Sequence, residues 1–361
     1  MDYEKRRRKL RRSLKKAGFE ALLVTDFTNV TYLTGFTGDD SYLLVRQDGE
    51  VLLSDGRYTT QISQECPGLE AETRGPSLKM MDLIERVVRQ SKVQQLAIES
   101  HSATVGFRET LTERLTSVEV VSSSGLVSEL RQVKDAKEVE LIRDAVDIAE
   151  RAFAAIRATV RRDQTEKQLA DELEYQMRRL GARAASFPSI IAAGPQAALP
   201  HAVPCEEPVG RDGLLLIDWG ARRNGYVSDL TRVLMLDKIS AKMRRAYGVV
   251  LKAQQEAIAA VRPGITLKEL DGVARGVISD ARLGKYFGHG LGHGIGLQVH
   301  EAPIISSRSD EELKAGMVIT VEPGVYLPDL GGVRLEDDVL VTQDGHEVLT
   351  SVPKEFDEMV C

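Results

Sequence analysis

The 361-residue sequence has few cysteines and no long hydrophobic run, and each shortage excludes a class of protein. Its three cysteines, Cys66, Cys205 and Cys361, are widely spaced, which argues against a disulfide framework and against a thiolate metal site. No apolar run approaches the roughly 20 residues that span a bilayer, and the basic N-terminus lacks the apolar segment of a signal peptide. We therefore expect a cytoplasmic protein with no membrane partner.

A net positive charge is also lacking, because 54 acidic residues outnumber 48 basic ones and the formal net charge is −6 at pH 7. Such a chain has no general attraction to nucleic acid. The exception is the basic run from Lys5 to Lys16. Leu10, Leu14 and Ala17 recur there at helical spacing, which favours the solvated face of a first helix over a nucleic-acid patch. We expect no nucleic-acid partner.

The length and an ordinary composition, 42% hydrophobic and 28% charged, allow two domains that each bury a core. Strand-like and helical stretches alternate up to residue 125, which is typical of a small α/β domain. The segment Ser122-Ser-Ser-Gly125 is a short break before a new helix. We therefore predict domains at residues 1–125 and 126–361. The strands expected in the first domain are residues 21–25, 41–45, 51–54, 95–99 and 118–121.

Two aspartates lie in a predicted β-hairpin of the second domain. Apolar runs that contain Asp218 and Asp229 flank Asn224-Gly225, which is typical of a two-residue hairpin turn. That turn places Asp218 opposite Thr231 and makes Asp229 its diagonal neighbour on the same face. The two Cβ atoms should then lie roughly 7–8 Å apart, wide enough for a metal ion.

Two glutamates repeat this arrangement nearer the C-terminus. Glu322 and Glu336 lie in two strand-like runs joined by a loop that contains glycine and proline, and Pro323 favours an extended backbone at Glu322. By strand alternation Arg334, Glu336 and Asp338 share a face. Asp337 points the other way and is expected to be structural.

His293 lies in a run of alternating glycines, Gly-His289-Gly-Leu-Gly-His293-Gly-Ile-Gly. Glycines at these positions let the backbone approach whatever the imidazoles contact, and a helix is not expected there. Taken alone, the run is equally consistent with a tight loop that holds no ligand.

The second domain follows one plan twice. Helices predicted to start at capping boxes, Thr165 and Thr266, are followed by histidine-containing irregular segments and then by the acidic hairpins. Gly181 and Gly284 are expected to close these helices. Two related halves would each supply an acidic hairpin to one central site, and the alternative is a coincidence of common helix–strand order.

Four carboxylates and one imidazole suit hard or borderline divalent cations such as Mn²⁺, Co²⁺, Zn²⁺ or Fe²⁺. Gathered in one pocket without cations, the carboxylates would repel one another and raise each other's pKa values. Two such ions can share a water, lower its pKa and polarise a carbonyl, which is chemistry for amide hydrolysis. Each of these residues could instead have a structural role alone, since an aspartate after a strand is commonly a turn former.

Together these motifs resemble the pita-bread metallopeptidases, specifically the Xaa-Pro branch of aminopeptidase P and prolidase. The resemblance implies an α+β pita-bread catalytic domain with an internal pseudo-twofold duplication, preceded by a smaller α/β creatinase-type domain. The residues that carry it are Asn29 to Gly38, Asp55-Gly-Arg-Tyr58, Leu-Pro-His201, Asp218-x-Gly, Gly225-Tyr-x-Ser-Asp229-x-Thr-Arg, Gly-His289-Gly-x-Gly-His293-Gly-Ile-Gly, Val-His300-Glu, Thr-x-Glu322-Pro-Gly and Val-Arg334-Leu-Glu336-Asp-Asp.

The resemblance also implies a set of metal ligands. Asp229 and Glu336 would bridge two metal ions, and Asp218 would complete one of them. His293 and Glu322 would complete the other ion, with Glu322 also acting as general base.

The remaining motif residues would bind the substrate. His300 would stabilise the developing oxyanion, whereas His201, His289 and Arg334 would surround the proline and its carbonyl or carboxylate end. The sequence departs from the family pattern at Val233, where a second threonine often follows the arginine.

The implied activity is hydrolysis of the Xaa-Pro peptide bond through a metal-bridging hydroxide, with two divalent ions per chain, manganese first among them. The substrates would be proline-containing peptides, and the enzyme would be a homodimer. Both dipeptidase and aminopeptidase specificity fit the motifs. The competing hypotheses are a creatinase-like metal-free hydrolase and a non-catalytic peptide-binding homologue.

Overall fold

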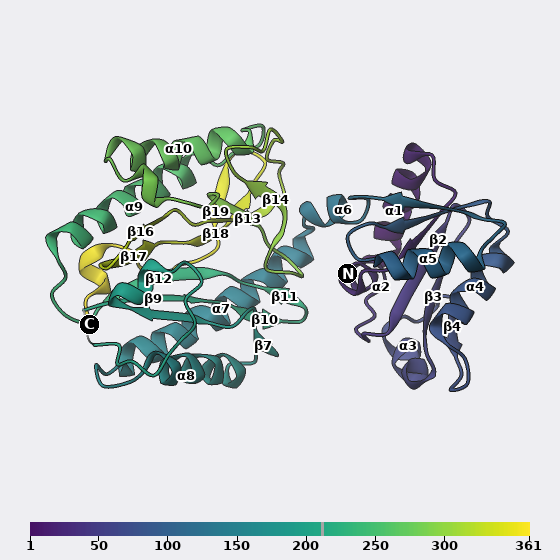
Figure 1. The fold of residues 1–361 in the computed structure, drawn as a ribbon, viewed down its shortest axis with the longest axis horizontal. Helices are drawn as coiled ribbons and strands as arrows, with labels where there is room; N and C mark the ends of the chain where they lie inside the picture. The colour runs from purple at the N-terminus through teal and green to yellow at the C-terminus, as the bar shows by residue number, and fades with distance from the viewer. Residues whose placement is uncertain (211–212) are drawn as a thin grey trace. The chain divides into compact units, whose positions relative to one another are not determined.

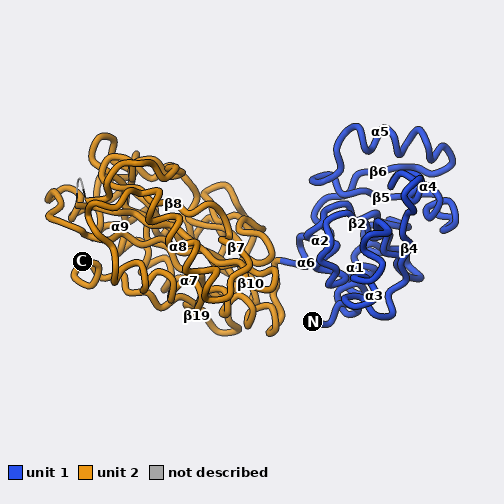
Figure 2. The backbone as a smooth tube through the Cα atoms, turned by 90° about the horizontal axis from the view of Figure 1, so that it is seen from below, with its two compact units in different colours: residues 1–131 blue, residues 132–361 orange. Residues whose placement is uncertain are grey.

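The computed structural model describes residues 1–210 and 213–361, which divide into two compact units, residues 1–131 and 132–361 (Figure 2). These are called the first and second unit below. The sequence predicts a domain boundary after Gly125. In the structure the chain passes from the first unit to the second between Arg131 and Gln132, within helix α6 (Ser128–Gln132). Over the described ranges, no helix has the length and apolar character needed to cross a membrane.

The first unit is a mixed sheet in the order β4-β3-β2-β1-β5-β6 with helices around it (Figure 1). Strands β1, β2 and β3 are antiparallel neighbours, and β4, β5 and β6 join in parallel. The strands are β1 Ala21–Val24, β2 Ser41–Arg46, β3 Glu50–Asp55, β4 Ala71–Arg74, β5 Gln95–Glu99 and β6 Glu119–Ser123. The helices are α1 Tyr3–Ala17, α2 Phe27–Thr34, η1 Gly56–Tyr58, α3 Thr59–Glu65, α4 Met80–Ser91 and α5 Val105–Arg114.

Strand β4 was missed in the sequence because it is a half-exposed edge strand, Ala-Glu-Thr-Arg, without apolar alternation. The basic run does form a helix, α1, as predicted. Leu10 and Leu14 are fully buried there, although Ala17 is exposed. Arg6 is buried as well, with its guanidinium 4.2 Å from the ring centre of Tyr32, whose carbonyl oxygen accepts a hydrogen bond from it.

The second unit places its strands between helices α7 and α8 on one side and α9 and α10 on the other (Figure 1). Each helix pair packs on an apolar cluster, and the cluster under α9 and α10 also contains first-half residues such as Leu216 and Val233. The helices are α7 Ala136–Thr159, α8 Glu166–Arg179, η2 Gly194–Ala198, α9 Ala241–Ala260, α10 Leu267–Asp280, η3 Gly284–Tyr286 and η4 Phe356–Met359. The strands are β7 Ala184–Ala185, β8 Ile190–Ala193, β9 Leu214–Trp219, β10 Ala221–Arg223, β11 Tyr226–Val227, β12 Leu230–Met235, β13 Gly292–Gly294, β14 Glu301–Ile305, β15 Val318–Val321, β16 Gly324–Leu327, β17 Gly331–Arg334, β18 Asp337–Val341 and β19 His346–Val348.

The aspartate hairpin has the predicted register. Asp218 on β9 pairs with Thr231 on β12, and the turn residues Asn224 and Gly225 have φ values of 49° and 87°. The hairpin is interrupted at Gly220, where a Cβ would lie 1.9 Å from the carbonyl oxygen of Ser228. Beyond that point β10 and β11 join β7 in a different sheet from β8, β9 and β12.

The glutamate hairpin is interrupted in the same way. Val321 pairs with Asp337 in one sheet, and Gly324 pairs with Arg334 in another. The register on either side therefore places Glu322 and Glu336 opposite each other at the interruption. The predicted acidic residues of both hairpins thus lie where one pair of strands passes from one sheet to the next.

The predicted capping boxes are confirmed. The Thr165 hydroxyl accepts a hydrogen bond from the backbone N–H of Gln168, and the Thr266 hydroxyl accepts one from Glu269, each at 3.1 Å. The expectation for Gly284 is wrong, since α10 ends at Asp280 and the left-handed residue after it is Arg282, with a φ of 62°.

Replacing either capping threonine should destabilise the second unit, because the first turn loses an acceptor. We expect Thr165→Ala and Thr266→Ala each to lower the free energy of unfolding by about 1 kcal/mol. Urea unfolding followed by fluorescence measures this, since the chain's one tryptophan, Trp219, is buried in this unit.

The control is Thr159→Ala at the end of α7, where the hydroxyl donates to the carbonyl of Ala155 in the same helix. We expect that variant to stay within about 0.5 kcal/mol of the wild type. Equal effects at all three positions would contradict the capping role.

Candidate active site

Every residue that the sequence analysis assigned to the site lines one cavity of about 760 Å³ in the second unit. Asp218, Asp229 and Glu336 are buried and Glu322 is half-buried, whereas His201 and His300 are exposed. The predicted residues that the cavity brings together are His201, Asp218, Asp229, His289, His293, His300, Glu322, Arg334 and Glu336.

The tightest cluster joins the two halves of the second unit. Asp229, His293 and Glu336 each offer a ligand atom within 4.8 Å of the others. The Nε2 atom of His293 lies 3.3 Å from Oε1 of Glu322 and 3.8 Å from Oδ2 of Asp229. The Nδ1 atom lies 3.1 Å from the carbonyl oxygen of Gly294, which directs Nε2 at the carboxylates.

The glycines around His293 let the backbone pass close to neighbouring strands rather than to a ligand. A Cβ on Gly292 would lie 2.1 Å from the carbonyl oxygen of Thr320, and one on Gly294 would lie 2.3 Å from that of Ala302. His293 therefore lies in a short strand, β13, pressed between β14 and β15.

Hydrogen bonds from neighbouring residues hold the Glu336 carboxylate and the backbone of Asp229 in place. The hydroxyl of Thr231 donates to Oε2 of Glu336 at 2.6 Å, and the backbone N–H of Asp229 donates to Oδ2 of Asp338 at 3.1 Å. Thr231 and Glu336 also form an isolated β-bridge, so the two hairpins meet at the cluster itself.

The carboxylates strongly perturb one another. Burial, followed by the negative charges around them, raises the pKa values of Asp229 and Glu336 well above the usual range. Burial also raises the pKa of Asp218, although Arg334 opposes it. Burial acts on Glu322 too, but the hydrogen bond and charge of His293 outweigh it and lower the pKa of Glu322.

This donor set fits divalent cations. Its ligand atoms are carboxylate oxygens and one imidazole nitrogen, the preference of hard and borderline metals. The Oδ1 atom of Asp218 is buried and has no hydrogen-bond partner among the described residues, and the same is true of Oδ1 of Asp338. A buried oxygen without a partner is costly, and a cation beside Asp218 removes that cost.

Arg334 is held by polar contacts on several sides. Its Nη2 atom lies 2.5 Å from Oδ2 of Asp218, and its Nε atom donates to the Thr231 hydroxyl at 3.1 Å. Its Nη1 atom donates to the Tyr326 hydroxyl at 2.8 Å, and that hydroxyl lies 2.9 Å from Nε2 of His289. Tyr326 was missed in the sequence, although strand alternation from Glu322 would have placed it on the site's face.

The histidines at the cavity differ in burial. Burial lowers the pKa of His289 and that of His300, which favours the neutral imidazole in both. The ring of His300 lies 4.4 Å, centre to centre, from that of His293. His201 lines the same cavity from the segment after η2.

An apolar wall, also missed in the sequence, completes the cavity. It comes from loops and strand ends that no local pattern connects, so it becomes visible only in the fold. Its residues are Phe187, Pro188, Ile190, Val203, Val299 and Ile304.

Comparison with known proteins gives matches over both units. Residues 140–343 match the model of metallopeptidase family M24, and residues 6–133 match the creatinase/prolidase N-terminal domain. The predicted fold, an α+β pita-bread domain with internal duplication after a smaller α/β domain, agrees with these matches and is confirmed.

Individual relatives match along nearly the whole chain. An Xaa-Pro dipeptidase of Pyrococcus horikoshii is 35% identical over 342 residues, covering 94% of this chain and 95% of the relative. The solved structure of an Xaa-Pro dipeptidase from Bacillus anthracis has a TM-score of 0.95 at 35% identity and covers 100% of both chains. That of an X-Pro aminopeptidase from Thermotoga maritima has a TM-score of 0.88 at 35% identity, covering 97% of this chain and 100% of the other.

The family matches span both units, and the relatives cover almost the full length at this level of identity. The chain therefore belongs to metallopeptidase family M24 and is a peptidase that carries the creatinase/prolidase N-terminal domain.

Proposed function

We propose that this peptidase hydrolyses the bond between an N-terminal residue and proline, with two divalent metal ions per chain. The observation that carries the proposal is the convergence of four carboxylates and His293 in one buried cluster beside an apolar wall. The names of the relatives, Xaa-Pro dipeptidase and X-Pro aminopeptidase, support the proline preference.

The proposed ligand set divides between the two ions. Asp229 and Glu336, which come from different halves, would be shared by both ions. Asp218 would complete the ligands of one ion, and His293 with Glu322 those of the other. Bound there, the ions would activate a water near neutral pH and would cancel the repulsion among the carboxylates.

The chain's own groups position the substrate and handle the proton. Glu322 accepts the proton of the attacking water, and its lowered pKa keeps the carboxylate ionised and able to accept. His300, exposed at the cavity and close to His293, donates to the substrate's carbonyl oxygen. His201, His289 and Arg334 surround the end of the substrate beyond the scissile bond.

The apolar wall gives a physical reason for the proline preference. The nitrogen of an Xaa-Pro bond carries no hydrogen, and the ring fixes φ near −65°, so recognition through that N–H is impossible. A wall of Phe187, Pro188 and Ile190 can instead pack the ring by shape. Manganese as the metal and a homodimer stay predictions of the resemblance, and a cytoplasmic location stays a prediction of the sequence.

Removing metal should abolish turnover, because the carboxylate cluster would lose the charge that neutralises it. We expect dialysed apo-enzyme to be inactive on Xaa-Pro peptides and MnCl₂ or CoCl₂ to restore hydrolysis. Turnover that is unchanged without metal would favour the creatinase-like hydrolase, and no turnover under any condition would favour the non-catalytic homologue.

Asp229→Asn and Glu336→Gln should each lower kcat at least about a hundredfold, because each removes a charged oxygen that bridges the ions. Metal content measured on the same samples should fall below that of the wild type. Asp344→Asn, a change at an exposed turn residue, is the matched control and should leave both quantities unchanged. Near-normal activity with normal metal content in the two site variants would overturn the ligand assignment.

Substrate length is tested by comparing Xaa-Pro with Xaa-Pro-Xaa-Xaa. The Arg334 guanidinium is already bonded to Asp218, Thr231 and Tyr326, so it is poorly available to a free proline carboxylate. We therefore expect both peptides to be cleaved, with kcat/KM values within about tenfold, or 1.4 kcal/mol. Cleavage of the dipeptide alone would establish a strict dipeptidase and contradict this expectation.

A further inference from the structure

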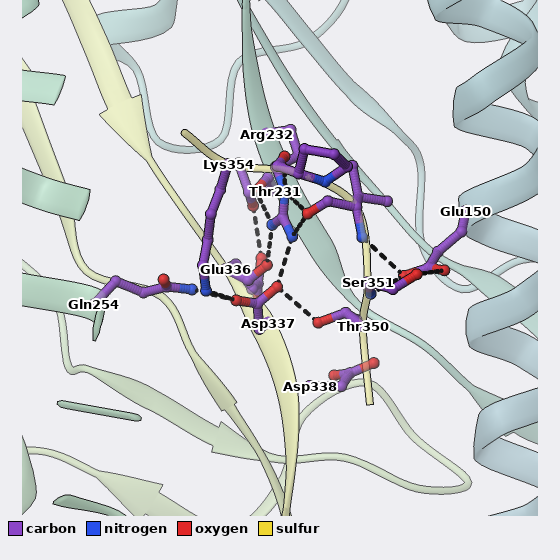
Figure 3. Close-up of polar contacts among 12 residues, drawn as sticks. Glu150, Thr231, Arg232, Gln254, Glu336, Asp337, Asp338, Thr350, Ser351 and Lys354 are labelled. Carbon is purple, nitrogen blue, oxygen red and sulfur yellow. Dashed lines mark hydrogen bonds and ion pairs between the residues drawn. The ribbon is translucent and has the colours of Figure 1, made fainter. Parts of the chain in front are cut away.

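A second charged cluster lies next to Glu336, and Arg232 and Asp337 at its centre are not among the residues that line the cavity. Figure 3 shows the polar contacts of this cluster. At its centre, Nη2 of Arg232 lies 2.6 Å from Oδ1 of Asp337, and the side chain of each is 1% exposed. Arg232 follows Thr231 on β12, and Asp337 follows Glu336 at the start of β18. Strand alternation therefore points this pair away from the cavity.

Arg232 joins three separate stretches of chain. Its Nη1 atom donates to the carbonyl oxygens of Thr231, at 3.0 Å, and Glu336, at 2.6 Å. Its Nε and Nη2 atoms donate to the carbonyl oxygens of Val352 and Pro353 in the C-terminal segment. One planar guanidinium thus connects the first half, the second half and residues 352–353.

The carboxylate of Asp337 also accepts hydrogen bonds from residues other than Arg232. Its Oδ1 atom also accepts from the hydroxyl of Thr350 at 2.7 Å, and its Oδ2 atom accepts from Nε2 of Gln254 on α9 at 2.7 Å. The ammonium of Lys354 donates to Oδ2 as well (Figure 3). These contacts connect the C-terminal segment and α9 to the backbone next to Glu336.

The pair therefore lies at the join on which the site depends. The halves meet where the backbone N–H of Glu336 donates to the carbonyl oxygen of Thr231 at 3.2 Å. Arg232 donates to the carbonyl oxygens of these same two residues. Any shift between β12 and β18 would move the Glu336 carboxylate relative to Asp229.

Stability alone does not explain two buried charges here. Replacing a buried ion pair with well-packed apolar residues is often neutral or stabilising, because desolvation offsets the attraction. Geometry does explain them, since only a guanidinium can bond this many oxygens in one plane.

We propose that Arg232 and Asp337 are positioning residues, which hold Glu336 opposite Asp229 across the join between the halves and thereby set the affinity of the site for its metal ions. This inference rests on the proposed metal site and names the residues behind it. Neither residue touches the substrate or a metal ion.

The test measures metal binding and catalysis separately in Arg232→Lys and Asp337→Asn. Apo-protein is titrated with MnCl₂ by calorimetry, and kcat and KM are then measured at saturating Mn²⁺. We expect at least tenfold weaker binding of an ion and at least a tenfold lower kcat, with KM changed less than threefold. Lysine keeps the charge, but three donors on one nitrogen cannot reproduce the planar set of bonds to Thr231, Glu336 and the segment at residues 352–353, so it should not rescue either quantity.

The control is Leu173→Ala, which opens a cavity under helix α8, away from the residues that line the active-site cavity. It should lower the melting temperature without changing Mn²⁺ affinity. If Arg232→Lys and Asp337→Asn behave like this control, with a lower melting temperature and wild-type Mn²⁺ affinity, the pair is only structural and the proposal is overturned.

A milder variant covers the case in which Asp337→Asn does not fold. Thr350→Val removes one hydrogen bond to Asp337 and leaves the ion pair intact. It should weaken Mn²⁺ binding measurably but by less than Arg232→Lys does, and unchanged affinity would count against the proposal. Because calorimetry needs no turnover, a wild type that binds Mn²⁺ yet cleaves no Xaa-Pro peptide would refute the proposed function and still test the pair.

Discussion

The rest of this structure depends on one constraint, the repulsion among buried carboxylates, which neighbouring groups must compensate. Asp229 and Glu336 are held close to each other and to Asp218 and Glu322, and burial with mutual charge raises the pKa values of the first two. A fold gains nothing from such a cluster by itself, because each charge costs free energy to bury. Arg334 compensates Asp218 and His293 compensates Glu322, while cations at the centre would compensate the bridging pair.

The acidic residues come from both halves of the second unit, two from each hairpin. Each half of the second unit has its own helix pair, and the apolar cluster under α9 and α10 contains Leu216 and Val233 beside Val321, so one core supports both acidic hairpins. Each hairpin passes from one sheet to another near its acidic residues, and the cavity lies at that point. The Arg232–Asp337 pair then joins the two hairpins on the side away from the cavity, and Arg334 joins them beside the cavity through Asp218 and Thr231.

Local features of this arrangement were predictable from the sequence. The Asn224-Gly225 turn determines the pairing of Asp218 with Thr231, because a two-residue loop allows few registers. Capping boxes at Thr165 and Thr266 depend on residues three apart, and those predictions were confirmed. The predicted site residues converge in one cavity because the motifs, through their family resemblance, carry information about the fold.

Features that depend on distant contacts were not predictable. Strand alternation places Tyr326 on the site's face, but its hydrogen bonds to His289 and Arg334 arise only in the fold. Asp337 was predicted to be structural and Arg232 was read only as part of a motif, since nothing local shows that residues 350–354 return to bond them. Gly284 was misplaced because Arg282, a residue rarely found at positive φ, ends the helix instead.

The central claim is that the carboxylate cluster holds two metal ions bridged by Asp229 and Glu336. Anomalous diffraction at the manganese edge, from crystals of protein reconstituted with MnCl₂, tests it most directly. The account predicts two peaks about 3.5–4 Å apart, with oxygens of Asp229 and Glu336 in contact with both. A single peak in the cluster, or peaks that do not contact these two carboxylates, would contradict it.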